Sequence, residues 1–367
     1  MALTFLPLLV LSCLVGVITQ YIYQRRKAQE DKAIANHHGC LPAPRLQNQR
    51  PWGVDRLEQI FRADAESRLM ELFLFHFRQT GSTLEQKFLG TKAYGTIEPA
   101  NLEAIMSTKF KIYLIIDRNL STDRAGDGQQ GRYVFLDAVA KSSADRAALR
   151  GQIINLLAAG RDTTACLLSW TFFLLVRHPQ VLAKLREEIT TVCGDSGELT
   201  RDVLKRLPYL QNVLKETLRL YPSVPVNTRT TVRTTVLPTG GGPDRKSPVL
   251  IPKGSAVAFS VYSMHRRPDL YGMDAELFRP ERWDEDMPMH KDPTNAKWAY
   301  LPFHGGPRIC LGMEFALAEA GYVVVRLLQR FPHIKLPQDE KVELVGVEQQ
   351  VMTLVVSIKQ GCRVEIR

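Results

Sequence analysis

Residues 303–312 read Phe-His-Gly-Gly-Pro-Arg-Ile-Cys-Leu-Gly, and the apolar spacing of the next eighteen residues predicts a helix. Cys310 therefore stands just ahead of a predicted helix amino terminus. There the helix dipole and free backbone N–H groups stabilise a thiolate, the form of cysteine that binds metal. A lone cysteine in a glycine turn is more often an ordinary buried thiol. The joint spacing of Phe303, Arg308, Cys310 and Ala316 is too specific for that interpretation.

The residues around this cysteine suit a flat cofactor. Gly306 and Gly312 carry no side chains, so a flat group can approach the backbone closely. Arg308 can hydrogen-bond a carboxylate such as a haem propionate, and Phe303 can shield the sulfur from water. The stretch resembles the haem-binding signature of the cytochrome P450 haem-thiolate monooxygenases. The resemblance implies that Cys310 is the axial ligand of the iron of haem b, where thiolate donation favours O–O cleavage.

A second motif, Ala-Gly-Arg-Asp-Thr-Thr at residues 159–164, lies in a long helix predicted for residues 145–178. From the residues alone, Thr163 would bond the carbonyl four residues back and Asp162 would be solvated. The resemblance favours a different role, the oxygen-activation motif of the family. It implies that Asp162 and Thr163 relay protons to dioxygen and that Gly160 leaves room for the oxygen.

A third motif pairs Glu216 and Arg219, opposite charges at i,i+3 on one predicted helix. Exposed pairs of this kind are common and contribute little to stability. The resemblance instead implies the structural Glu-x-x-Arg signature of the family, completed by Arg282 in the segment 278–283.

The segment after that helix extends the resemblance. Pro222, Pro225 and Arg229 follow at the family's spacing, and Arg229 matches a common haem-propionate donor. His265 has no comparable match and is interpreted as a packing residue. Residues 220–229 and 264–267 look most like the fungal branch that hydroxylates alkanes and fatty acids. That branch is microsomal and draws electrons from the NADPH-dependent reductase.

The amino terminus predicts a membrane anchor. Residues 1–24 carry no Asp, Glu, Lys or Arg, and about 20 apolar residues span a bilayer core. The basic residues Arg25, Arg26 and Lys27 follow it, which orients the rest of the chain to the cytosol. A cleaved signal peptide would need a basic start and a small-x-small cleavage site, and both are missing. We therefore expect a single-pass membrane protein, and the resemblance to the microsomal branch implies the membrane of the endoplasmic reticulum.

Three segments are predicted: an anchor at 1–24, a basic stretch and Pro-rich hinge at 25–51, and a haem-binding monooxygenase domain at 52–367. Prolines at 42, 44 and 51 would stiffen the hinge. The body is mainly α with a minor β portion. The predicted helices cover 53–79, 99–107, 145–178, 180–193, 201–206, 209–221 and the stretch from Cys310 to Arg330. The predicted strands lie at 83–89 and 92–97, within 222–263, where a glycine triplet marks a hairpin turn, and within 346–367.

Composition excludes several classes of protein. The chain has 367 residues, 45% hydrophobic and 23% charged, which is a globular composition. Its six cysteines include no CxxC pair, which argues against zinc ribbons and disulfide scaffolds. The 48 basic and 38 acidic residues give a net charge of +10. Without a basic run or DNA-binding motif, that charge favours a membrane surface or acidic protein partner over nucleic acid.

The chain departs from the family between residues 111 and 144, where longer members place several helices, including most of the substrate roof. The family's Trp-x-x-x-Arg helix should lie there; the same spacing at Trp52 and Arg56 is interpreted as coincidental. We expect a P450 fold lacking part of the distal helices. Cys310 should then face Asp162 and Thr163 across a gap, with residues 114, 157 and 158 unusually exposed.

The predicted function is a monooxygenase that inserts one atom of dioxygen into an aliphatic substrate, a fatty acid or an n-alkane. The implied partners are the NADPH-cytochrome reductase, membrane lipid, the small aliphatic substrate and dioxygen. The alternative is a catalytically impaired haem-binding protein that lacks the distal roof. A soluble binding module without haem would leave the cysteine motif unexplained.

Overall fold

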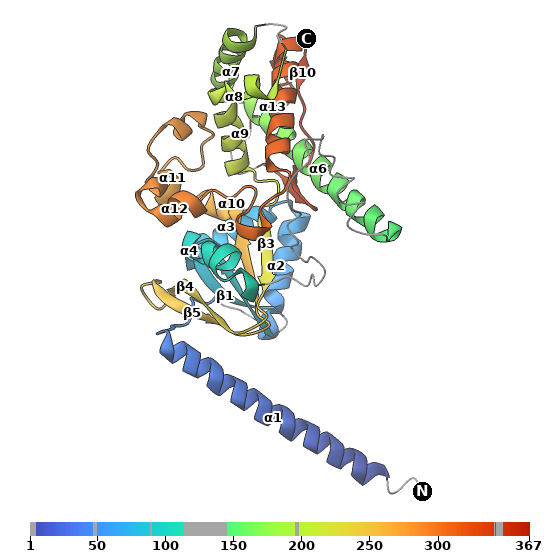
Figure 1. Cartoon of the computed structure of the whole chain (residues 1–367), viewed down its shortest axis with the longest axis vertical. Helices are drawn as coiled ribbons and strands as arrows, with labels where there is room; N and C mark the ends of the chain where they lie inside the picture. The colour runs from blue at the N-terminus through green and yellow to red at the C-terminus, as the bar shows by residue number, and fades with distance from the viewer. Residues whose placement is uncertain are drawn as a thin grey trace, which may run out of the picture.

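The computed structural model describes residues 5–46, 50–88, 90–113, 145–194, 198–340, 342 and 348–367. The fold is mainly helical with small sheets, as predicted (Figure 1). The longer helices are α1 (Phe5–His37), α2 (Val54–Ala65), α3 (Leu69–Thr80), α6 (Arg146–Leu175), α7 (Pro179–Cys193), α9 (Pro208–Leu220) and α13 (Met313–Arg330). Shorter ones are α4 (Pro99–Glu103), α8 (Arg201–Lys205), α10 (Val261–Met264), α11 (Pro268–Tyr271) and α12 (Pro293–Trp298).

The amino-terminal helix α1 projects away from the body (Figure 1). It does not break at the basic residues 25–27, and continues to His37. Among the described residues, no one helix combines the length and apolarity needed to cross a membrane. Ala147–Leu175 and Pro179–Cys193 meet that test together by length and composition, with a 111° bend between them.

The predicted Pro-rich hinge is held against the body. The amides of Gly242 and Glu85 donate to the carbonyls of Pro42 (3.1 Å) and Pro44 (2.8 Å). The amide of Leu41 donates to Pro248 (2.9 Å), and Ala43 is 4% exposed. Proline lacks an N–H but keeps its carbonyl acceptor, so a Pro-rich strap can still pair with neighbouring strands. Residues 41–46 of the predicted hinge are therefore a strap that is packed on the body.

The single helix predicted for 53–79 is two helices. Ser67 has φ 61°, a left-handed conformation that an α-helix cannot continue through. The amides of Ser67 and Arg68 donate back to Asp64 (2.9 Å) and Ala63 (2.7 Å), which closes the end of α2. α3 then begins at Leu69 in a new direction. Periodicity missed the break because both helices are amphipathic.

The strands form one four-stranded sheet and three two-stranded ones within the described residues. The first has the order β1-β2-β6-β3, from β1 (Thr83–Phe88), β2 (Thr91–Thr96), β6 (Ala256–Ser260) and β3 (Val226–Thr230). The hairpin of β1 and β2 is as predicted. The others pair β4 (Thr235–Gly241) with β5 (Ser247–Ile251), β8 (Gln350–Met352) with β9 (Val356–Ile358), and β7 (Ile334–Lys335) with β10 (Glu365–Ile366).

The helical core lies where α6, α7, α9 and α13 meet (Figure 1). Trp170 of α6 is fully buried there and stacks on Tyr221, with ring centroids 3.7 Å apart. The amino-terminal half of α6 is uncovered by the described residues: Ile154 and Leu157 are 54% and 66% exposed. The exposure expected at Leu157 is confirmed; Ala158 is half-buried. The other expectations for the distal side of the fold concern residues 114–144, which lie outside the described part of the chain.

Candidate functional site

Residues 303–312, called the cysteine loop below, form a short turn that backbone hydrogen bonds close. The amide of Cys310 donates to the carbonyl of Phe303 (3.0 Å), and that of Ile309 to Gly306 (3.1 Å). Gly306 has φ 68°, and a Cβ there would lie 1.9 Å from the carbonyl oxygen of Met106. Glycine is therefore required at this position for the loop to pack on the π-helical turn Ala104–Thr108.

Cys310 lies at an open, apolar surface. It is exposed, and α13 begins three residues later, so its sulfur lies near the positive end of a helix. Nearby, Ile309, Leu311 and Phe315 are 49%, 80% and 72% exposed. A Cβ on Gly312 would meet no atom within 4 Å. This combination of thiol, glycine and uncovered apolar side chains fits a large flat group that covers them.

Two cationic side chains lie close together beside this loop. Arg229 of β3 is 6% exposed; burial, and then the charge of Arg308, lower its pKa. Its Nη1 donates to the neutral side chain of Asn227 (2.7 Å), a contact that does not offset the charge of the guanidinium. Burial and the charge of Arg229 lower the pKa of His304 to about 4, and its buried Nε2 has no hydrogen-bond partner among the described residues.

The residues at this site can be compared with the groups that a haem would require. A cluster of like charges with an unpartnered buried nitrogen favours an anionic group, and haem carries two propionates. Arg229 and Arg308, expected separately from the sequence, are brought together by the structure. With Cys310 and the open apolar surface, the residues present fit a haem.

Asp162 and Thr163, in the second motif, make the contacts that were predicted from the residues before the family resemblance was considered. The Thr163 hydroxyl donates to the carbonyl of Ala159 (2.6 Å), and Asp162 pairs with Arg161 (2.7 Å) in solvent. Neither side chain hydrogen-bonds to the cysteine loop within the described structure. Their helix, α6, packs against α13, which follows Cys310. A Cβ on Gly160 would meet nothing within 4 Å, which is consistent with an open space beside this part of α6.

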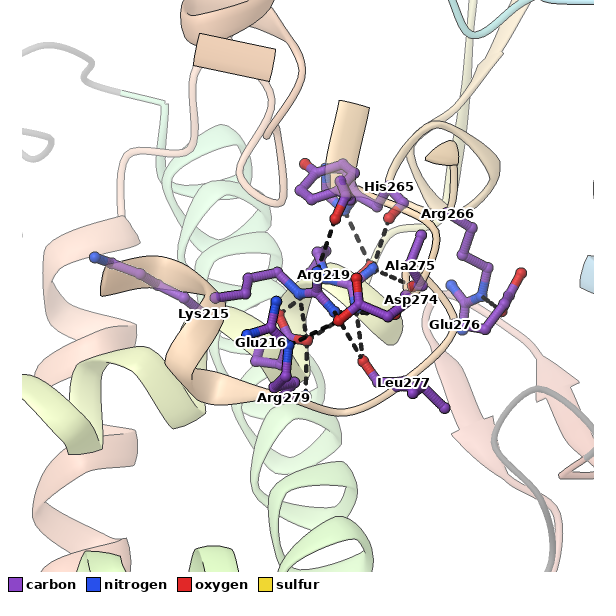
Figure 2. Close-up of polar contacts among 12 residues, drawn as sticks. Lys215, Glu216, Arg219, His265, Arg266, Asp274, Ala275, Glu276, Leu277 and Arg279 are labelled. Carbon is purple, nitrogen blue, oxygen red and sulfur yellow. Dashed lines mark hydrogen bonds and ion pairs between the residues drawn. The ribbon is translucent and has the colours of Figure 1, made fainter. Parts of the chain in front are cut away.

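Glu216, Arg219 and Arg282 form one fully buried cluster. Figure 2 shows Glu216 and Arg219 at its centre. Both carboxylate oxygens of Glu216 accept from Arg219 at 2.9 Å, and Oε1 also accepts from Arg282 Nε at 3.0 Å. Trp283 Nε1 and the Arg279 amide complete its shell at 3.1 and 3.0 Å. Five donors on one buried carboxylate make a structural hub that joins α9 to the segment 265–283.

Sequence reasoning missed the role of His265. It is fully buried; its Nδ1 donates to the Arg219 carbonyl (3.1 Å), and its Nε2 accepts from the Leu301 amide (3.0 Å). Burial and the charge of Arg219 lower its pKa to about 3, which keeps this acceptor neutral. His265 thus ties the Glu216 hub to the segment that leads into Phe303. The sequence signal that could have indicated this role is the position of His265 directly before two arginines, Arg266 and Arg267.

Comparison with known proteins gives the family of the chain. A family model described as Cytochrome P450 matches residues 103–358. A "Cytochrome P450" of Arthroderma benhamiae is 34% identical over 497 aligned positions, covering 98% of this chain and 99% of that protein. "Cytochrome P450 52A6" of Candida tropicalis is 49% identical over 60% of this chain and 42% of its own length. "Cytochrome P450 monooxygenase alt2" of Alternaria solani is 48% identical over 58% of this chain and 39% of its own length. In the last two alignments the chain spans less than half of the relative.

Proposed function

Because this chain belongs to the cytochrome P450 family, we propose that it is a haem-thiolate monooxygenase acting on an aliphatic substrate. The observation that carries the proposal is the exposed Cys310 thiol, with exposed apolar neighbours and with the charge of Arg308, two residues away, acting on the buried Arg229. When bound there, haem b supplies the dioxygen chemistry of the reaction.

The chain's own residues hold and tune that group. Cys310 would ligate the iron, Arg229 and Arg308 would bind the propionates, and Phe303 would shield the sulfur. Glycines 306 and 312 would let the macrocycle lie close to the backbone. Thr163 and Asp162 would hold a proton on α6; for that the Thr163 hydroxyl must turn from the Ala159 carbonyl.

The substrate is proposed to be a fatty acid or n-alkane, hydroxylated at its end. The relatives called Cytochrome P450 52A support this branch, at 44–50% identity over 59–70% of the chain. Terminal hydroxylation removes no charge from a fatty acid, so the product stays amphiphilic. Electrons would come from NADPH through a membrane reductase.

We propose that α1 anchors the enzyme in the endoplasmic reticulum membrane, with the domain 52–367 in the cytosol. Its side chains at Leu14, Val15 and Val17 are 52–69% exposed, with no protein to cover them in the described structure. The packed strap at residues 41–46 would hold the domain at a fixed orientation to that helix.

The shortness of the chain is proposed to be an internal deletion near residues 111–144. The alignment to the Arthroderma protein has 497 positions, at least 130 (497 minus 367) more than this chain can fill. The exposed half of α6 favours a second candidate, a haem-binding protein with impaired turnover. One experiment separates the two: NADPH oxidation and hydroxylated product measured with reductase and dodecanoate. Product formation supports the monooxygenase, and haem binding without product supports the impaired protein.

A further inference from the structure

Hydrogen bonds join one face of α6 to two segments that are distant from it in sequence. The residues concerned are Thr163, Cys166 and Trp170, whose spacing places them on the same side of the helix. The Ser223 hydroxyl donates to the carbonyl of Thr163 (3.1 Å). The Cys166 thiol and the Trp170 indole N–H both donate to the carbonyl of Val356 (3.0 and 2.9 Å). These three hydrogen bonds are called the α6 seam below.

The two partners of the α6 seam are fixed to each other and to the core. The Val356 amide donates to the Ser223 carbonyl (3.2 Å), and Ser223 is buried. Tyr221, just ahead of it in the chain, stacks on Trp170. Pro222 lies between Tyr221 and Ser223, and its ring fixes its φ. The backbone that carries the Ser223 hydroxyl is therefore held in place by its own neighbours.

Thr163 lies where the packed part of α6 meets the uncovered part. Leu167 and Trp170, on its carboxyl-terminal side, are buried. Ile154 and Leu157, on its amino-terminal side, are exposed, and that half of α6 extends away from the other helices (Figure 1). Among the described residues of α6, followed from its amino terminus, Thr163 is the first that hydrogen-bonds to a segment distant in sequence. Helices open from their uncovered ends, so this bond limits how far the opening reaches.

The hydrogen bond at Thr163 has no duplicate in the α6 seam. The Val356 carbonyl accepts from two side chains, so the loss of one would leave the other. Burial raises the pKa of the Cys166 thiol to about 11, which keeps that thiol protonated as a donor. Ser223, by contrast, is the one described residue outside α6 that donates to the Thr163 carbonyl. Removing its hydroxyl would therefore release this turn of α6 and leave the rest of the seam in place.

We propose that Ser223 is a positioning residue for Thr163. By holding the Thr163 carbonyl, it fixes the turn of α6 from which the Thr163 hydroxyl would pass on a proton. In this structure that hydroxyl donates to the Ala159 carbonyl (2.6 Å), so it must turn away to act. Threonine in a helix has two accessible χ1 rotamers, so the hydroxyl can turn while the held backbone stays in place. The catalytic consequence rests on the proposed monooxygenase function, whereas the attachment of α6 does not.

The attachment is tested by hydrogen–deuterium exchange of the purified full-length chain, measured by mass spectrometry. Ser223→Ala removes the hydroxyl and keeps the backbone bond to Val356. We expect the amides of residues 163–166 to exchange about threefold to tenfold faster than in the wild type, because the loss of one hydrogen bond corresponds to that factor. Exchange at residues 170–175 should not change. Ser223→Thr retains a hydroxyl and should restore the wild-type rates.

The matched control is Thr171→Val, on the same helix. It removes a buried hydroxyl that donates to the Leu167 carbonyl (2.8 Å), about two turns beyond Thr163. Because Thr171 does not contact the Thr163 carbonyl within the described structure, exchange at residues 163–166 should stay at the wild-type rate. Near-ultraviolet circular dichroism checks that each variant is folded.

The catalytic role is tested by the product formed per NADPH consumed, with reductase and dodecanoate. Ser223→Ala should lower this ratio several-fold at unchanged haem content, and Ser223→Thr should restore it. Thr171→Val should leave the ratio at the wild-type value. Because Ser223 acts through Thr163, the double variant Ser223→Ala/Thr163→Ala should form no less product per NADPH than Thr163→Ala alone.

The proposal can fail at the attachment or at the catalytic role. Wild-type exchange at residues 163–166 in folded Ser223→Ala would show that the hydroxyl does not hold α6. Faster exchange with an unchanged product ratio, or additive losses in the double variant, would overturn the positioning of Thr163 by Ser223. A haem-loaded wild type that forms no product would contradict the monooxygenase function instead, and the exchange result alone would then decide whether Ser223 holds Thr163.

Discussion

Replacing Glu216 with alanine removes the carboxylate at the centre of the buried hub. Five donors would lose their acceptor: two on Arg219, one on Arg282, the Trp283 indole and the Arg279 amide. Arg219 keeps three backbone carbonyls, and Arg282 keeps Asp274 at 3.0 Å. These remaining partners reduce the loss of stability, but within the described structure Arg219 would then carry a buried charge with no carboxylate in contact.

Removing one partner of a buried ion pair costs about 3–5 kcal/mol. An unfolding entropy of about 2.1 cal/mol/K per residue gives roughly 0.8 kcal/mol/K for this chain. The expected loss in Tm is therefore about 4–6 °C. Because the hub ties α9 to the segment before Phe303, haem retention should fall with it.

Differential scanning calorimetry of the full chain in detergent measures this change. The matched control is Glu314→Ala, which breaks an exposed pair with Arg201 at 2.9 Å and should shift Tm by less than about 1 °C. A Glu216→Ala variant as stable and as haem-loaded as Glu314→Ala would refute the reasoning that this cluster is a buried structural hub.

Three further outcomes are expected. Thr163→Ala should leave Tm within about 2 °C but lower the product formed per NADPH consumed, and unchanged coupling would make Thr163 a packing residue. Gly306→Ala should lower haem retention, because its Cβ would meet the Met106 carbonyl at φ 68°, whereas Gly151→Ala, in open space on α6, should not. Histidines 76, 265 and 304, with pKa values lowered to about 4, 3 and 4, should make the fold acid-sensitive. Their contribution is full above about pH 6.5 and falls by up to ~1.4 kcal/mol per pH unit for each histidine as pH drops toward 4; equal urea midpoints at pH 7 and pH 5 would contradict this.

Sequence patterns predicted most of the helices because the signals are local. Asp145 caps α6, accepting from the Ala147 amide at 2.8 Å, and α13 runs to Arg330 as expected. The break at Ser67 was missed because a left-handed serine leaves no mark on hydrophobic periodicity. The packed strap at 41–46 was missed because its partners, the β4–β5 hairpin and Glu85, are distant in sequence.

The candidate site also contains residues that local motifs reveal and contacts that they do not reveal. Motif spacing placed Cys310, Glu216 and Arg219, each on or beside a helix. The hydrogen bonds of His265 to Arg219 and Leu301 depend on segments 36 or more residues away.

The central claim is that Cys310 holds a haem through its thiolate. The most direct measurement is the reduced, CO-bound absorption spectrum of the purified 367-residue chain reconstituted with haem, beside that of Cys310→Ser. The account predicts the red-shifted Soret band of a thiolate-ligated haem in the wild type and its loss in the variant. A wild-type chain that takes up no haem, or a variant with an unchanged spectrum, would contradict it.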